Sequence, residues 1–311
     1  MTGTITEEGP ETPSPRHAEE PPRHRAAVNL LVPLLLVLAG VSVLLYPVVA
    51  TQFNNVKQQQ FAARYNSQVQ EVSPDVLAQQ LERAHAYNAT LSGVPILDPY
   101  LEDVSKAPSS GSYSNYLHTL DAFDAMARIR VPSGQIDLPV YHGTSQETLA
   151  RGAGHLYGTS LPVGGDNTHA VLTSHTGLSS ATLFDHLTQV KIGDLMYVDV
   201  YGQTLAYQVD SIKVVLPTQT DDLRVVPGKD LLTLFTCTPY AVNTHRLLVT
   251  GHRVPFTAAA SAPATPVSSL LRLQPWMYGL LGGAVAVLLL LVLVVAREIR
   301  RAGRGPSRAL P

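Results

Sequence analysis

The only cysteine of the chain, Cys237, lies where an apolar, β-favouring run that starts at Leu231 meets Pro239. Proline cannot donate a hydrogen bond to a sheet and tends to end a strand, so we expect the thiol at a strand end, where it can face a cleft. A second β-favouring run begins at Arg246, after a loop that contains the turn-favouring Asn243. If the two runs pair as a hairpin, the guanidinium lies beside the thiol.

A thiol beside a guanidinium is a candidate nucleophile, because nearby positive charge favours the reactive thiolate. The alternative is that Cys237 is a small buried hydrophobic residue, as most lone cysteines are. A single cysteine excludes an internal disulfide and a cysteine-rich metal site. His175, which follows a short apolar run and precedes Gly177, has an imidazole able to transfer protons near neutral pH. It is one of 11 histidines, so its own chemistry does not single it out.

Two sequence blocks resemble the signature of the sortases, the transpeptidases of Gram-positive cell surfaces. The block Thr233-Leu-Phe-Thr-Cys237 precedes Arg246, and the block Ser174-His175-Thr-Gly177-Leu lies upstream. Neighbouring blocks agree as well, such as Leu138-Pro-Val-Tyr-His-Gly-Thr144. The resemblance covers about residues 95–256 and is closest to the class C, or pilin-polymerising, sortases.

The resemblance implies a role for each of these residues. Cys237 is expected to be the nucleophile, His175 the proton-transfer partner, and Arg246 the group that steadies substrate and oxyanion. The implied reaction cleaves an LPXTG-like sorting signal between Thr and Gly through a thioester, which a lysine of the next pilin subunit then resolves. The expected partners are therefore pilin or surface proteins that carry such a signal, together with an acceptor pilin lysine.

Other functions remain as alternatives. The nearest is a housekeeping sortase that attaches proteins to peptidoglycan precursor, although the lid-like loop and the second apolar segment described below favour pilin assembly. A surface cysteine peptidase would use the same thiol and release its product to water. A membrane-anchored binding module would need no reactive thiol at all.

Asp98-Pro99-Tyr100 resembles the lid motif of the class C enzymes. The resemblance implies that Asp98 pairs with an arginine of the site, while Tyr100 covers Cys237 until the loop moves. The alternative is a simple Asp-Pro turn. Two positions depart from the family pattern: Thr176 stands where many relatives have an arginine, and Tyr100 replaces the more frequent Trp or Phe.

Alternating apolar residues predict the sheet that positions these side chains. The pattern runs through residues 136–140, 196–201 and 205–209, with turn signals between the short runs. Many short strands of this kind predict a mainly β domain with a closed or nearly closed barrel, and the resemblance implies the sortase-type barrel of about eight strands. Upstream, Phe53 to Gly93 is expected to be helical, with Ser73-Pro74-Asp75 as a helix cap.

Two uncharged apolar segments, 30–50 and 276–296, are each long enough to cross a bilayer as a helix. For the first, a signal peptide cleaved after Ala50 is the alternative. Five arginines follow the second segment and three precede the first, which predicts cytoplasmic termini and an extracellular domain between the spans.

The net charge of −2 and the pI near 6.6 argue against a nucleic-acid partner. The histidines lack a carboxylate or thiol set at ligand spacing, so we expect neither a metal nor a cofactor. The expected organisation is a disordered cytoplasmic tail (1–26), a transmembrane helix (27–50), a helical approach with the lid (51–126), the catalytic barrel (127–256), a linker (257–275), a second transmembrane helix (276–296) and a basic cytoplasmic tail (297–311).

Overall fold

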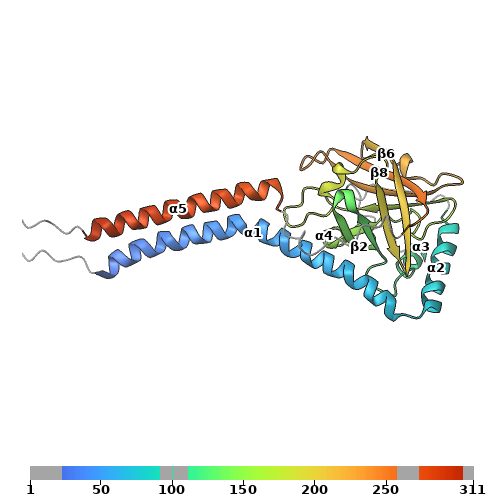
Figure 1. Cartoon of the computed structure of the whole chain (residues 1–311), viewed down its shortest axis with the longest axis horizontal. Coiled ribbons are helices and arrows are strands. Elements are labelled where there is room, and N and C mark those ends of the chain that lie inside the picture. The colour runs from blue at the N-terminus through green and yellow to red at the C-terminus, as the bar shows by residue number, and fades with distance from the viewer. Residues whose placement is uncertain (1–22, 92–99, 101–110, 258–272, 304–311) are drawn as a thin grey trace, which may run out of the picture. The chain divides into compact units, whose positions relative to one another are not determined.

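The computed structural model describes residues 23–91, 100, 111–257 and 273–303 (Figure 1). The predicted lid residues Asp98 and Pro99 lie outside the described residues, as do most of the predicted linker and parts of both tails. The chain divides into two compact units, of which one is Tyr46–Met277 and the other combines Met1–Leu45 with Tyr278–Pro311.

Eight strands of the first unit close into a barrel in the order β1-β2-β3-β4-β7-β8-β6-β5. The pairs β2/β3 and β4/β7 are parallel, and the other neighbours are antiparallel. This confirms the closed barrel expected from the alternating pattern. The strands are β1 (Ala127–Val131), β2 (Ile136–His142), β3 (Ala153–His155), β4 (Thr168–Thr173), β5 (Leu195–Val200), β6 (Gln203–Val215), β7 (Asp230–Thr238) and β8 (His245–Val254).

The helices lie mainly before and after the barrel in the sequence (Figure 1). Short 3-10 turns occupy residues 132–134, 185–189 and 221–223. The helices are α1 (Arg23–Glu71), α2 (Pro74–Ala89), α3 (Gly111–Leu117), α4 (Gln146–Arg151) and α5 (Pro275–Gly303).

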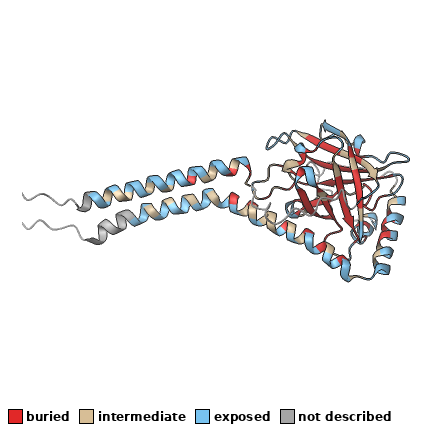
Figure 2. Ribbon diagram, viewed as in Figure 1, coloured by how far each residue is buried: buried red, intermediate tan, exposed pale blue. Residues whose placement is uncertain are grey.

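The side chains that point into the barrel form its main hydrophobic core. On β7, Leu232 and Leu234 are fully buried in this core, together with Val249 of β8 and Val198 of β5. Buried residues accordingly concentrate in the strands, as Figure 2 shows. Because side chains alternate along a strand, the odd-numbered residues of β7, including Phe235, point out of the barrel.

The second half of α1 packs on the barrel through one stripe of its surface. Its buried residues Thr51, Gln58, Ala62, Tyr65 and Val69 recur at helical spacing. The Tyr65 hydroxyl donates to the carbonyl of residue 126 at 3.1 Å and accepts from the N–H of residue 201 at 2.9 Å. This half of the helix, from Tyr46 onward, is therefore part of the same folded unit as the barrel.

Helix α2 starts at Pro74, with Ser73 at the N-cap position and Asp75 in the first turn, as the sequence predicts. The Ser73 side chain makes no capping hydrogen bond, and its carbonyl instead accepts from the N–H groups of Val76 and Leu77. The helix ends at Ala89, where the Thr90 hydroxyl donates to a carbonyl of the last turn at 2.7 Å. The predicted stop at Gly93 lies outside the described residues.

Two helical stretches, Leu31–Glu71 and Pro275–Arg300, contain windows long and apolar enough to cross a membrane. Their apolar windows are almost entirely unburied within the protein, with 11% and 6% of their residues buried. Side chains such as Leu36 and Leu293 are about two-thirds exposed. A core helix of a soluble protein would bury such residues, so by length, composition and exposure both helices could span a membrane.

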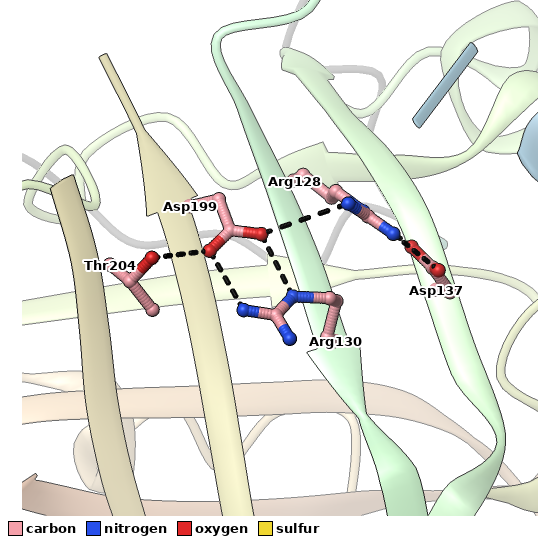
Figure 3. A network of polar contacts seen from close by, with 5 residues as sticks. All are labelled: Arg128, Arg130, Asp137, Asp199 and Thr204. Carbon is pink, nitrogen blue, oxygen red and sulfur yellow. Dashed lines mark hydrogen bonds and ion pairs between the residues drawn. The ribbon is translucent and has the colours of Figure 1, made fainter. Parts of the chain in front are cut away.

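Two arginine–aspartate pairs lie on the outer face of β1, β2 and β5 (Figure 3). Arg128 makes two hydrogen bonds of 2.6 Å to Asp137, and Arg130 makes two of 2.8 and 2.9 Å to Asp199. Burial alone would lower the pKa of Arg128, but the hydrogen bond and charge of Asp137, helped by Asp199, outweigh it and raise the pKa. These four charges are mutually satisfied, which is the condition for burying charge.

A buried aromatic cluster surrounds His155. The Tyr116 hydroxyl lies 3.0 Å from His155 Nδ1 and accepts from the N–H of Gly143 at 2.8 Å, while His155 Nε2 donates to the carbonyl of Ser160 at 2.8 Å. Burial lowers the pKa of His155 to about 4. This cluster anchors α3, the helix that follows the predicted lid segment in the sequence.

Removing Asp137 should destabilise the barrel strongly, because Arg128 would stay buried without its main partner. We expect Asp137→Ala to lower the free energy of unfolding by about 3 kcal/mol. The measurement is urea denaturation of the detergent-solubilised chain, followed by near-ultraviolet circular dichroism. Asp222→Ala, which breaks the exposed Lys213–Asp222 pair, is the matched control and should cost less than about 1 kcal/mol. Equal losses for the two variants would contradict the expectation.

Stability should fall as the pH drops from about 6.5 to about 4. In this window His155 binds a proton in the unfolded chain but stays neutral in the folded chain. Proton binding therefore stabilises the unfolded state and lowers the free energy of unfolding. The full effect of this one group is about 3 kcal/mol. Denaturation at several pH values measures the slope, which His155→Gln should reduce by about one proton. A variant with the wild-type slope would show that this histidine does not cause the acid sensitivity.

Candidate active site

The hairpin predicted from Pro239 and Asn243 is confirmed. β7 and β8 are antiparallel, and their register pairs Cys237 directly with Arg246. Residues opposite each other in such a pair point to the same face, with Cβ atoms about 5 Å apart. Both side chains are largely buried, at 6% exposed for the cysteine and 3% for the arginine.

His175 reaches the same face from the other side of β7. β4 runs parallel to β7 with Thr173 opposite Phe235, and the N–H of Ser174 still donates to the carbonyl of Phe235 at 3.4 Å. Continuing this register by two residues brings His175 beside Cys237. Cys237 and Arg246 thus lie on the paired strands β7 and β8, and His175 lies two residues past the end of β4, which pairs with the other edge of β7.

The turn after His175 packs closely on the loop after Cys237. Gly177 has a positive φ of 79°, and a Cβ at this position would meet the backbone nitrogen of Ala241 at 3.1 Å. A side chain would therefore be strained here in conformation and in space. The glycine allows the two loops to meet beside the thiol.

Thr176, the departure from the family pattern, holds the end of β4 against β7. Its hydroxyl lies 2.7 Å from that of Thr236, which in turn donates to the carbonyl of Ser174 at 2.7 Å. Thr176 is only 6% exposed. At this position a hydroxyl is easily accommodated, whereas an arginine would bring a charge into a buried place.

Electrostatics at the site favour a proton-transfer pair. Burial lowers the pKa of His175, so its imidazole is mostly neutral at pH 7. The Arg246 guanidinium donates through Nη1 to the carbonyls of Asn243 at 3.0 Å and His245 at 3.2 Å. A buried permanent cation next to a thiol stabilises the thiolate.

Tyr100, the one described residue of the predicted lid motif, lies over this site. Its ring centroid is 5.5 Å from that of His175 and 5.2 Å from the guanidinium carbon of Arg246. Its hydroxyl donates to the carbonyl of Ser174 at 2.8 Å and lies 3.0 Å from the hydroxyl of Thr173. The ring thus contacts His175 after β4, Phe235 of β7 and Arg246 of β8, on the face of the barrel to which Cys237 points.

An apolar wall continues the site along the outer face of the barrel. Tyr100 packs on a small buried cluster, and its ring centroid is 5.9 Å from that of Phe235. Leu223 joins this cluster from the connection between β6 and β7. The cluster consists of Leu156, Val171, Leu223, Phe235 and Leu248.

Two other barrel histidines have protein partners instead of a place at the site. His155 belongs to the aromatic cluster described above, and His169 lies 2.8 Å from the carbonyl of Arg224 and 2.7 Å from the hydroxyl of Thr233. Sequence context alone could not separate these residues from His175. Within the described part of the chain, no three His, Cys, Asp or Glu side chains gather closely enough to hold a metal ion.

A family model described as the sortase domain matches residues 129–254, which is the barrel. The solved structure of sortase C-1 from Actinomyces oris is 57% identical to this chain, with a TM-score of 0.57, and the match covers 58% of this chain and 99% of that one. The chain belongs to the sortase family of cysteine transpeptidases.

Other relatives agree. Sortase C of Streptococcus pneumoniae, whose structure is described in terms of catalysis and pilin substrate specificity, is 40% identical with a TM-score of 0.58, over 64% of this chain and 98% of that one. Sortase A of Streptococcus agalactiae is 34% identical over 125 residues, which are 39% of this chain and 49% of the relative. The match thus spans about half the length of this last protein.

If Tyr100 covers the thiol, its removal should expose Cys237. We expect Tyr100→Ala to react about tenfold faster with a small thiol reagent, because the ring and two hydroxyl contacts are lost. Tyr100→Phe keeps the ring and should give an intermediate rate. Tyr240→Ala, which removes a half-exposed ring three residues from the thiol, is the control and should react like the wild type. Labelling of all three variants at the wild-type rate would argue against a cover.

Proposed function

We propose that this chain is a class C sortase, a membrane-anchored transpeptidase that joins pilin subunits. The observation that carries the proposal is the register of three adjacent strands: β7 and β8 pair Cys237 with Arg246, and the pairing of β4 with β7, continued by two residues, brings His175 to the same face. The relatives named above, two of them class C enzymes, support a sortase-type transpeptidation. The roles of the three residues follow from their chemistry.

In the first half-reaction, the Cys237 thiol gives its proton to the neutral His175 imidazole, and the resulting thiolate attacks the threonine carbonyl carbon of an LPXTG-like sorting signal. Arg246 donates hydrogen bonds to the oxyanion of the tetrahedral intermediate. When the Thr–Gly bond breaks, the His175 imidazolium gives its proton to the departing glycine amine, and a thioester remains on the enzyme. The lowered pKa of His175 makes the imidazolium a better acid for this step.

In the second half-reaction, the amine of an acceptor lysine attacks the thioester carbonyl. His175, now neutral, takes the proton that the amine loses, and the tetrahedral intermediate collapses to an amide and the Cys237 thiolate. No cofactor takes part in either half-reaction. The net reaction exchanges one amide bond for another.

The cover over the site supports the pilin reading. Tyr100 lies on His175 and Arg246, so a substrate must displace it before its carbonyl can reach the thiol. Asp98-Pro99-Tyr100 resembles the lid motif of class C sortases, which agrees with this position of Tyr100. The alternative remains a housekeeping sortase that anchors surface proteins to peptidoglycan precursor.

The apolar segments of α1 and α5 would each span the membrane. Arginines before the first segment and after the second favour cytoplasmic termini, so the barrel would face the cell exterior. In this arrangement the enzyme would meet its substrates where they leave the membrane.

The decisive experiment follows a sorting-signal peptide through both half-reactions. We incubate the full chain in detergent with the peptide and a pilin domain and use intact mass spectrometry to detect first an adduct on Cys237 and then a peptide–lysine amide. Cys237→Ala should form neither product. Arg246→Lys keeps the charge but loses the planar fork, and acylation should slow at least about tenfold.

The products separate the alternatives. Hydrolysis alone, despite abundant pilin and amine, would identify a peptidase and overturn the proposal. Transfer to peptidoglycan precursor but not to pilin would identify a housekeeping sortase. Unimpaired function of Cys237→Ala in cells would favour a binding module.

A further inference from the structure

His175 lies beyond the last strand bond of β4, so the sheet alone does not fix its position. The loop that follows it, residues 176–185, is here called the His175 loop. It folds back on itself, because the N–H of Phe184 donates to the carbonyl of His175 at 3.1 Å and the N–H of Gly177 donates to Asp185 Oδ1 at 2.7 Å. What holds this loop also holds the imidazole.

One set of external contacts comes from α1. Asn55 forms two hydrogen bonds with Thr182: its Nδ2 donates to the hydroxyl at 2.8 Å, and its Oδ1 accepts from the backbone N–H at 3.0 Å. One turn before Asn55, Thr51 Oγ1 donates to the carbonyl of Ser179 at 2.9 Å. The adjacent Asn54 donates through Nδ2 to the carbonyl of Ser180, also at 2.9 Å. These polar residues directly follow the first apolar segment in the sequence.

The other contact comes from Gln274, the residue just before α5. Its Nε2 donates to the Thr182 hydroxyl at 3.0 Å and to Asp185 Oδ2 at 2.9 Å. Its Oε1 accepts from the indole N–H of Trp276 at 2.6 Å, which orients the amide. Gln274 is only 8% exposed. Burial raises the pKa of Asp185, and the hydrogen bonds from Gly177 and Gln274 counter that rise.

Asn55 and Gln274 therefore meet at Thr182, although they are far apart in the sequence. Asn55 lies in α1 shortly after its apolar segment, and Gln274 lies directly before α5. Gln274 also reaches Asp185, and Asp185 holds Gly177, two residues from the imidazole. A continuous chain of side-chain hydrogen bonds thus links both segments to the turn that carries His175.

We propose that Asn55 and Gln274 are positioning residues, which hold the His175 loop so that the imidazole stays aligned with Cys237. The inference rests on the proposed function for its catalytic consequence. Asn55 acts through Thr182, and Gln274 acts through Thr182 and Asp185. The segments next to the two apolar helices would then contribute to catalysis as well as to anchoring.

The test uses the full chain in detergent, with Asn55→Ala and Gln274→Ala. Loss of these hydrogen bonds should raise amide exchange of residues 177, 182 and 184 about tenfold, while β4 and β7 keep wild-type exchange. A looser loop hydrates the imidazole, so its pKa, followed by NMR of histidine-labelled protein, should move up towards 6.5. The kcat of acylation should fall about tenfold, with KM for the peptide within about twofold.

Matched variants separate positioning from general damage. Asn66→Ala removes an amide from the same helix that makes no side-chain hydrogen bond to the described part of the chain, and Gln208→Ala removes one that donates to Gly193. Both should behave as wild type. Asn55→Asp keeps an acceptor for the Thr182 N–H and should restore most of the kcat.

Three results would overturn the proposal: an unchanged His175 pKa together with unchanged loop exchange, a uniform rise of exchange across the barrel, or a kcat that Asn55→Asp does not restore. Failure of the proposed function gives a different result. In that case the wild type forms no acyl-enzyme, while the exchange and pKa measurements still decide whether these two residues hold His175.

Discussion

The parallel pairing of β4 with β7, next to the antiparallel pairing of β7 with β8, is the constraint on which the candidate site depends. A strand with one parallel and one antiparallel neighbour can carry a residue between two others that lie far from it in the sequence. Cys237 has Arg246 opposite it on one side and the extension of β4 towards His175 on the other. A slip of one residue in either ladder would turn a side chain to the barrel interior.

The barrel core maintains this register. Leu232 and Leu234 must point inward, which sends Phe235 and Cys237 outward, so the same burial that stabilises the fold aims the thiol. The outer face near the thiol is apolar and, in this structure, covered by Tyr100. The Tyr100 ring packs on the Arg246 guanidinium and the His175 imidazole. The cation–π contact with the ring partly offsets the cost of burying the charge of Arg246.

Sequence patterns predicted the elements that depend on local signals. Pro239 and Asn243 marked the end of one strand and the following turn, so the pairing of Cys237 with Arg246 could be expected from these local signals alone. The position of His175 could not be derived in this way, because parallel pairing joins distant segments and leaves no local signal. The family resemblance supplied that residue, and it supplied Tyr100 as well.

For other residues the sequence pattern predicted the wrong environment or predicted nothing. Arg128, Arg130 and Asp199 alternate with apolar residues, a pattern typical of a solvent-facing strand surface. Yet Arg128 and Asp199 are buried and Arg130 is half-buried, in ion pairs with carboxylates of the neighbouring strands. Asn55 and Gln274 are amides beside apolar segments, with nothing in their neighbourhood to connect them to Thr182. Their role depends on tertiary contacts, which composition and periodicity do not encode.

The strand ladder that holds Cys237 and Arg246 is more rigid than the loop that holds His175. Cys237 and Arg246 belong to a continuous ladder, whose many backbone hydrogen bonds and buried side chains open only with the barrel itself. His175 lies past the last ladder bond, and side-chain hydrogen bonds hold the loop behind it, each of them worth only about 1 kcal/mol. A proton-transfer residue must stay within reach of both thiol and leaving amine, so several such bonds have to act together. That explains why two segments distant in sequence both converge on the loop behind the imidazole.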